Sequence, residues 1–189
     1  MRILCIGDSN TYGFDPRSCL GSRYPAETRW TGRLGNHEVI NSGINGLQIP
    51  GDSKPFADLV RSKTPDLVTV MLGSNDLLEG ADAETAGKRM ERFLADIREA
   101  AAMIFLIAPP VMQYGDWVRS SELIKEARKL GPVYRELAER TGILFADAEE
   151  WNVELTFDGV HFSPEGHAAF AGELAGRLNE LQNNIKNPV

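Results

Sequence analysis

Short apolar runs alternate along this chain with longer amphipathic segments, and this alternation restricts the fold more than any other feature. The apolar runs are only a few residues long, which is typical of strands buried on both faces of a sheet. The predicted strands span residues 2–6, 38–40, 67–72, 103–108 and 143–146. Strands that alternate with helices favour right-handed βαβ units. We therefore predict an α/β protein, a three-layer α/β/α sandwich around a five-stranded parallel sheet.

Apolar residues at helical spacing mark the segments between these strands. The predicted helices begin near Pro55 and span residues 83–102, 121–140 and 163–181. Gly131-Pro132 predicts a break or kink, because proline removes a backbone donor from a helix. Ser163 is placed to cap the last helix, and the polar residues 183–189 predict a frayed tail. The sequence has no internal repeat, so we expect one domain over residues 1–189.

Composition excludes several classes of function. The 189 residues carry a net charge of −7, so a basic surface for nucleic acid is not expected. No apolar run approaches the ~20 residues of a membrane-spanning helix, and the N-terminus does not resemble a signal peptide. Cys5 and Cys19 show neither metal-ligand spacing nor a disulfide framework. These features favour a cytoplasmic enzyme or binding protein.

The most unusual local sequences follow three of the predicted strands, where open α/β sheets bind their ligands. Gly7-Asp8-Ser9-Asn10 could expose a serine hydroxyl beside a helix N-terminus, although all of these residue types also favour ordinary turns. Gly73-Ser74-Asn75-Asp76 could offer an amide donor or simply cap a helix. Gly46, within the segment 41–46, could bring a backbone N–H close to a substrate or be a loop glycine.

The last predicted helix is preceded by Asp158-Gly159-Val160-His161. Asp158 is close enough in sequence to hold one ring nitrogen of His161 and leave the other free as a base. The other two histidines, His37 and His167, are most simply surface or structural residues. Taken together, a serine, amide donors and an Asp/His pair at the same edge of the sheet are the parts of an acyl-transfer enzyme.

These four blocks, in this order, resemble those of the SGNH hydrolases, also called the GDSL esterase/lipase family. The resemblance spans residues 2–180 and implies a flavodoxin-like SGNH hydrolase fold. Residues 2–9 and Arg29-Trp30-Thr31-Gly32 resemble the small bacterial arylesterase and acyltransferase branch, which is close to acetyl-xylan esterases. Two departures stand out: Asn10 replaces the leucine of the GDSL block, and Leu47-Gln48 replace polar residues that are frequent in relatives.

The resemblance implies a role for each matching residue. Ser9 would be the nucleophile, His161 the general base and Asp158 the residue that orients the imidazole. The oxyanion would be held by the backbone N–H groups of Ser9 and Gly46 and by the side-chain amide of Asn75. Asp8 and Asp76 would be structural, and neither a metal ion nor an organic cofactor is required.

We interpret the chain as a serine esterase acting on short-chain, acetyl-type esters of small molecules. Aromatic and apolar loop residues would line the substrate site, or alternatively pack in the core: Trp30, Pro110, Met112, Tyr114 and Phe162. A carbohydrate O-acetylesterase is the first alternative, and a thioesterase or lysophospholipase ranks below it. A catalytically silent binding module is the alternative outside enzymes. A homo-oligomer is compatible with the sequence.

Overall fold

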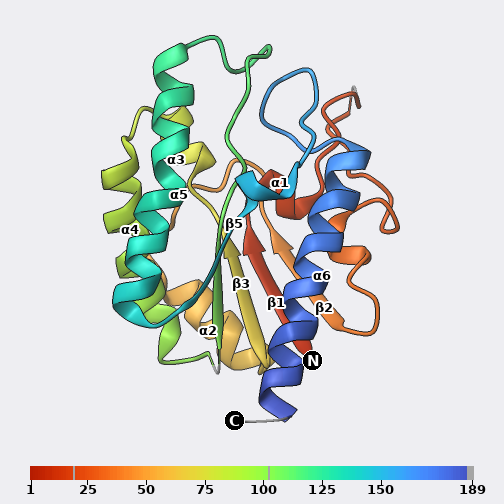
Figure 1. Ribbon diagram of the computed structural model, residues 1–189, viewed down its shortest axis with the longest axis vertical. Helices are drawn as coiled ribbons and strands as arrows, with labels where there is room; N and C mark the ends of the chain where they lie inside the picture. Colours follow the sequence, from red (N-terminus) through yellow and green to blue (C-terminus); the bar gives the residue numbers. More distant parts are fainter. Residues whose placement is uncertain (19, 102, 187–189) are drawn as a thin grey trace.

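The computed structural model describes residues 1–18, 20–101 and 103–186, and it is built around one parallel β-sheet (Figure 1). The strands are β1 (Arg2–Gly7), β2 (Glu38–Gly43), β3 (Leu67–Met71), β4 (Ile104–Ala108) and β5 (Leu144–Asp147). They are arranged in the order β2-β1-β3-β4-β5, and every neighbouring pair is parallel. The predicted five-stranded parallel sheet is confirmed. Cys19, Ala102 and the last three residues of the predicted frayed tail lie outside the described residues. Residues 183–186 of that predicted tail are helical, so the prediction is wrong for them.

Side chains of the central strands alternate between two hydrophobic cores. In β1, Leu4 and Ile6 pack into the first core, whereas Ile3 and Cys5 pack into the second. The same alternation separates Leu106 from its neighbours in β4. Because successive side chains of a strand point to opposite faces, a run that is apolar throughout must be covered on both sides.

Helices supply that cover on each face of the sheet (Figure 1). They are α1 (Ser9–Tyr12), α2 (Lys54–Lys63), α3 (Ser74–Leu78), α4 (Ala83–Arg98), α5 (Ser121–Thr141) and α6 (Pro164–Lys186), with 3-10 turns η1 (Trp30–Gly32) and η2 (Ala148–Trp151). The first core lies between the sheet and α2, α4 and α5, and the second lies between the sheet and α6, η1 and η2. This is the predicted three-layer sandwich. Among the described residues, no helix combines the length and apolarity needed to cross a membrane.

The sequence predicts a break or kink at Gly131-Pro132. A break is wrong, because α5 is a single helix that contains Pro132. Its buried face includes Leu130, Tyr134 and Leu137. Burying each large apolar side chain is worth roughly 1.5–3 kcal/mol, so several of them offset the ~3 kcal/mol cost of an interior proline. The predicted N-cap of α6 is confirmed, since the Ser163 hydroxyl accepts a hydrogen bond from the backbone N–H of Gly166 at 2.9 Å.

Two short helices that the sequence did not predict stand at the carboxyl ends of neighbouring strands. α1 begins two residues after β1 ends, and α3 begins three residues after β3 ends. The chain passes from β1 to β2 on one side and then to β3 on the other. Such a change of direction leaves a crevice at the carboxyl ends of the strands, where open α/β sheets place their ligands.

Candidate active site

The turn between β1 and α1 holds Ser9 at the carboxyl edge of the sheet. Asp8 is the N-cap of α1, and its Oδ1 accepts the backbone N–H of Asn10 at 2.9 Å. Burial raises the pKa of the Asp8 carboxyl to about 6. The turn also needs glycine at position 7, because a Cβ there would lie 2.0 Å from the Thr11 Oγ1 and 2.9 Å from the Met71 carbonyl. The first residue of α1 is thus fixed in place from both sides.

Ser9, His161 and Asp158 form a continuous hydrogen-bonded series. The Ser9 Oγ lies 3.0 Å from the His161 Nε2, and the His161 Nδ1 lies 2.7 Å from the Asp158 Oδ2. All three residues are buried, with exposed fractions of 6%, 2% and 0% respectively. The sequence separation of 152 residues between Ser9 and His161 is bridged only by the fold. This is the geometry in which a base can take a hydroxyl proton while a carboxylate holds its ring.

The second oxygen of Asp158 organises the turn that carries His161. Asp158 Oδ1 accepts the backbone N–H groups of Val160 and His161, each at 2.9 Å. Burial opposes ionisation of this carboxyl, but hydrogen bonds from the ring and backbone of His161 and from Val160 lower its pKa to about 2. Asp158 is therefore a carboxylate at neutral pH, and both of its oxygens act as acceptors. It favours the His161 tautomer that carries a proton on Nδ1 and leaves Nε2 free as an acceptor.

Three potential donors belong to residues that line one pocket. Gly46 and Asn75 line it together with Ser9. In the described part of the chain, neither the backbone N–H of Ser9 nor that of Gly46 has a hydrogen-bond partner. The Asn75 amide donates to the Leu47 carbonyl at 3.1 Å and lies 3.5 Å from the Asp8 Oδ2. One amide hydrogen is thus anchored, and the other is only weakly engaged.

Two buried carboxylates, those of Asp8 and Asp76, contact the segments that carry these donors; Asp8 contacts Asn10 and Asn75. Asp76 Oδ2 accepts the backbone N–H of Ile49 at 2.9 Å, and Oδ1 pairs with the Arg89 Nη1 at 2.7 Å. Asp76 therefore ties α3 both to the loop that follows Gly46 and to α4. These contacts fit the structural roles that the sequence indicated for Asp8 and Asp76.

The pocket beside Ser9 is small, with a volume of about 110 Å³, and will be called the Ser9 pocket. Its lining residues come from five segments of the chain: Ser9, Phe14, Asn45, Gly46, Asn75, Trp117 and His161. Two aromatic rings flank the imidazole. The Phe14 ring lies 4.8 Å from the His161 ring, and the Trp117 ring stands edge-on to it at 5.0 Å. The base is thus held between apolar walls.

The five residues predicted to line the substrate site are not among those that line the Ser9 pocket. Four are buried elsewhere and the fifth points into solvent: Trp30, Pro110, Met112 and Phe162 are buried, and Tyr114 is 67% exposed. Phe162 packs on Phe170 in the second core, because it follows His161 in the chain and faces the opposite way. Trp30 also packs on Phe170 and donates its indole N–H to the Asn10 carbonyl at 3.0 Å.

Three pocket residues, Phe14, Asn45 and Trp117, were not predicted individually. Phe14 and Trp117 are nevertheless aromatic residues outside the helices and strands, the kind of residue that was expected to line the substrate site. The loop around Trp117 is bound to the segment of Asp158 by backbone hydrogen bonds, among them Trp117 N–H to the Asp158 carbonyl at 3.1 Å. With this pairing, Trp117 lies against His161 and Tyr114 lies outside the Ser9 pocket. No local sequence signal specifies which of these two aromatic residues lines the pocket.

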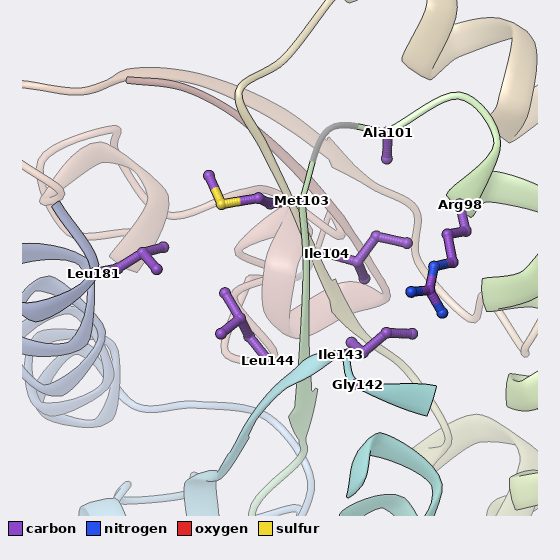
Figure 2. Close-up of a pocket in the computed structure, with 8 residues that line it drawn as sticks. All are labelled: Arg98, Ala101, Met103, Ile104, Gly142, Ile143, Leu144 and Leu181. Carbon is purple, nitrogen blue, oxygen red and sulfur yellow. The ribbon is translucent and has the colours of Figure 1, made fainter. Parts of the chain in front are cut away.

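A larger hollow of about 260 Å³ lies at the opposite edge of the sheet, at the amino ends of β4 and β5 (Figure 2). Figure 2 shows aliphatic side chains around it, such as Ile104 and Leu144, and one guanidinium, that of Arg98. Its described lining residues offer neither a nucleophile nor an acid–base pair. Of these two pockets, the Ser9 pocket is the one with a hydroxyl beside an imidazole.

Comparisons with known proteins agree with the fold. A family model described as the GDSL-like lipase/acylhydrolase family matches residues 5–169. An arylesterase from Vibrio mimicus is 25% identical over 196 residues, which cover 94% of this chain and 88% of that protein.

Two solved structures show similar chain folds. A candidate arylesterase from Agrobacterium tumefaciens is 29% identical, with a TM-score of 0.82, and the match covers 95% of this chain and 99% of that one. A carbohydrate acetylesterase family member from Sinorhizobium meliloti is 25% identical, with a TM-score of 0.82 and coverage of 95% and 98%. Because the family model spans most of the chain, including the segments of Ser9 and His161, this chain belongs to the GDSL-like lipase/acylhydrolase family and is a carboxylic ester hydrolase.

Proposed function

We propose that this protein is a serine esterase that hydrolyses short-chain, acetyl-type esters through an acyl-enzyme on Ser9. The observation that carries the proposal is the buried series from the Ser9 Oγ to the His161 Nε2 at 3.0 Å and from the His161 Nδ1 to the Asp158 Oδ2 at 2.7 Å. A structural histidine would not need a serine hydroxyl on one nitrogen, a carboxylate on the other and an open pocket beside both.

The proposed reaction has two similar halves. The Ser9 Oγ attacks the ester carbonyl while the His161 Nε2 takes its proton, and Asp158 stabilises the imidazolium that forms. Collapse of the tetrahedral intermediate expels the alcohol, which receives the proton from His161. Water then attacks the acyl-enzyme in the same way, with His161 as base, and releases the acid and the free Ser9 hydroxyl.

The tetrahedral oxyanion would be stabilised by the backbone N–H groups of Ser9 and Gly46 and by the Asn75 amide. Each donor of this kind is worth roughly 2.7–4 kcal/mol of barrier. The two backbone groups are unpaired among the described residues, so they lose no existing hydrogen bond when the oxyanion forms. Leu47 holds the Asn75 amide in place beforehand, which limits reorganisation during the reaction.

The size of the Ser9 pocket favours a small acyl group. A volume of about 110 Å³ accommodates an acetyl group and leaves little room for a long acyl chain. Large apolar side chains are exposed on the loops around the pocket, namely Ile44 at 50%, Phe157 at 57% and Trp117, which also lines the pocket, at 56%. We therefore place the acyl group inside the Ser9 pocket and a larger, apolar or ring-shaped alcohol on this exposed rim.

A carbohydrate O-acetylesterase is the second candidate. The exposed indole of Trp117 favours it, because an exposed aromatic face can support a sugar ring as readily as an aryl group. The names of the relatives include both classes, an arylesterase and a carbohydrate acetylesterase family member. Rates on phenyl acetate and on an acetylated xylo-oligosaccharide, compared as kcat/KM, distinguish the two alcohols.

Hydrolysis of p-nitrophenyl esters from acetyl to octanoyl tests the proposal directly. We expect kcat/KM to be highest for acetyl and activity to disappear in Ser9→Ala. Ser62→Ala is the matched control, since Ser62 is an exposed serine of α2 whose hydroxyl, among the described residues, donates only to the Leu59 carbonyl. Thioesters and lysophospholipids are tested in the same way, and a wild type that is inert toward all these substrates would favour a binding module. An active Ser9→Ala variant would remove Ser9 as the nucleophile.

A further inference from the structure

Asn10, the residue after Ser9, makes four hydrogen bonds although it is absent from the proposed mechanism. Its backbone N–H donates to the Asp8 Oδ1 at 2.9 Å, and its carbonyl accepts the Trp30 indole N–H at 3.0 Å. Its side chain crosses to the other end of the chain. There the Nδ2 donates to the Val160 carbonyl at 3.1 Å, and the Oδ1 accepts the Phe162 N–H at 2.9 Å.

The two side-chain contacts lie on either side of His161. A single amide group thus holds the backbone immediately before and immediately after the proposed base. Only one orientation of the amide satisfies both contacts, since a carbonyl accepts and an N–H donates. Asn10 is 4% exposed, so water does not readily replace either bond.

Few other contacts connect the serine turn to the histidine turn. Among the described residues, the hydrogen bonds between segments 7–12 and 157–163 are the two from the Asn10 side chain and the Ser9–His161 bond itself. The Ser9–His161 bond must break and re-form as the proton moves, so it cannot by itself keep the two segments in register. Asn10 follows Ser9 in the sequence, and its side chain is hydrogen-bonded to the residues on both sides of His161.

We propose that Asn10 is a positioning residue that keeps the His161 Nε2 within proton-transfer distance of the Ser9 Oγ. Its two side-chain bonds, to Val160 and Phe162, will be called the Asn10 clamp. The inference rests on the proposed function and assigns a purpose to an asparagine that replaces the leucine of the GDSL block. A leucine would fill a similar space but could neither donate to Val160 nor accept from Phe162, which leaves the His161 turn free to shift.

The expected consequence is a defect in chemistry rather than in substrate binding. Asn10 does not line the Ser9 pocket, so KM should change little. A displacement of about 1 Å between reacting groups can lower a rate by about 100-fold. For Asn10→Leu we therefore expect kcat to fall by about 10- to 100-fold. Diethyl p-nitrophenyl phosphate phosphorylates the nucleophilic serine of such enzymes. Its reaction with Ser9 needs the same proton transfer to His161 but does not involve a carboxylic ester, and its rate should fall by a similar factor.

The experiment measures kcat, KM and the phosphorylation rate for wild type, Ser9→Ala, Asn10→Leu and Asn10→Ala, each far below its own Tm. Asn10→Ala removes the same two bonds in a smaller side chain and serves if the leucine variant does not fold. Val60→Ala is the stability control, because Val60 is buried in the first core on α2, an element that carries neither turn. Its loss of stability should leave kcat close to the wild-type value.

The outcomes separate the two proposals. An active wild type with inactive Ser9→Ala supports the esterase function whatever the Asn10 variants do. If the Asn10 variants then lose kcat and phosphorylation rate together at nearly constant KM, the Asn10 clamp is supported. If they retain the wild-type kcat, or lose no more of it than Val60→Ala, the clamp is overturned while the esterase function stands.

Discussion

A buried histidine on α6, His167, leads to a quantitative prediction of how the free energy of unfolding changes with pH. His167, on α6, is fully buried, and its Nδ1 accepts the Trp30 backbone N–H at 3.4 Å. Its Nε2 has no hydrogen-bond partner among the described residues. Burial, together with the positive charges of Arg33 and Arg29, lowers the pKa of His167 from 6.5 to about 3.

The sign and size of the effect follow from proton linkage. Because the folded pKa lies below the unfolded value of 6.5, the contribution to stability is fully present above pH 6.5 and is lost as pH falls toward 3. At pH 5 the unfolded histidine is almost fully protonated and the folded one is not. With 6.5 and about 3 as the two pKa values, His167 alone should lower the free energy of unfolding by about 2 kcal/mol between pH 8 and pH 5.

Urea denaturation at pH 8 and pH 5, followed by tryptophan fluorescence, measures this loss in wild type and in His167→Gln. Glutamine can still accept from Trp30 but does not titrate, so the variant should lose about 2 kcal/mol less than wild type over this range. Other titrating groups are common to both proteins and largely cancel. His37→Gln controls for removing any histidine, since His37 is partly exposed. Equal losses in wild type and His167→Gln would refute the reasoning.

Three further predictions concern the Ser9 pocket and its supports. Asn75→Ala should lower kcat for p-nitrophenyl acetate by about 100- to 1000-fold with little change in KM, and an unchanged kcat would remove Asn75 from the oxyanion site. Gly115→Ala should lower the free energy of unfolding by roughly 1–3 kcal/mol in urea, because its Cβ would lie 2.3 Å from the Asp158 carbonyl carbon. Gly51→Ala, with no atom within 4 Å of the new Cβ, should change the same quantity little, and similar losses in both variants would contradict the steric argument. Trp117→Ala should raise KM for phenyl acetate by about 2- to 10-fold but leave KM for ethyl acetate nearly unchanged, and equal effects on the two esters would show that the indole does not contact the alcohol.

The sheet was predictable from the sequence because its signal is local. A run such as Ile104–Ala108 is short and apolar throughout, which is typical of a strand covered on both faces. Pro132 shows where local reasoning fails. The prediction of a break uses only the cost of one missing hydrogen bond, whereas the helix is decided by the side chains that α5 buries on both sides of the proline.

The candidate site divides in the same way. Ser9, Asp158 and His161 follow from short motifs with fixed order, and the structure brings them within hydrogen-bond distance. The walls of the pocket do not follow, because neighbouring residues in an extended segment face opposite sides. Phe162 and His161 are adjacent, yet one packs in the core and the other faces Ser9. Which aromatic residue lines a pocket depends on contacts between distant loops.

The departure at Leu47 illustrates why a substitution in a motif need not alter the chemistry beside it. The Asn75 amide donates to the backbone carbonyl of Leu47. Every residue type offers the same backbone acceptor. Its side chain packs against the first core and is not among the residues that line the Ser9 pocket. The position of the Asn75 amide is therefore independent of the side chain at position 47. Differences in ester preference from relatives with a polar residue there should depend instead on the pocket walls, Phe14 and Trp117, whose rings flank the base.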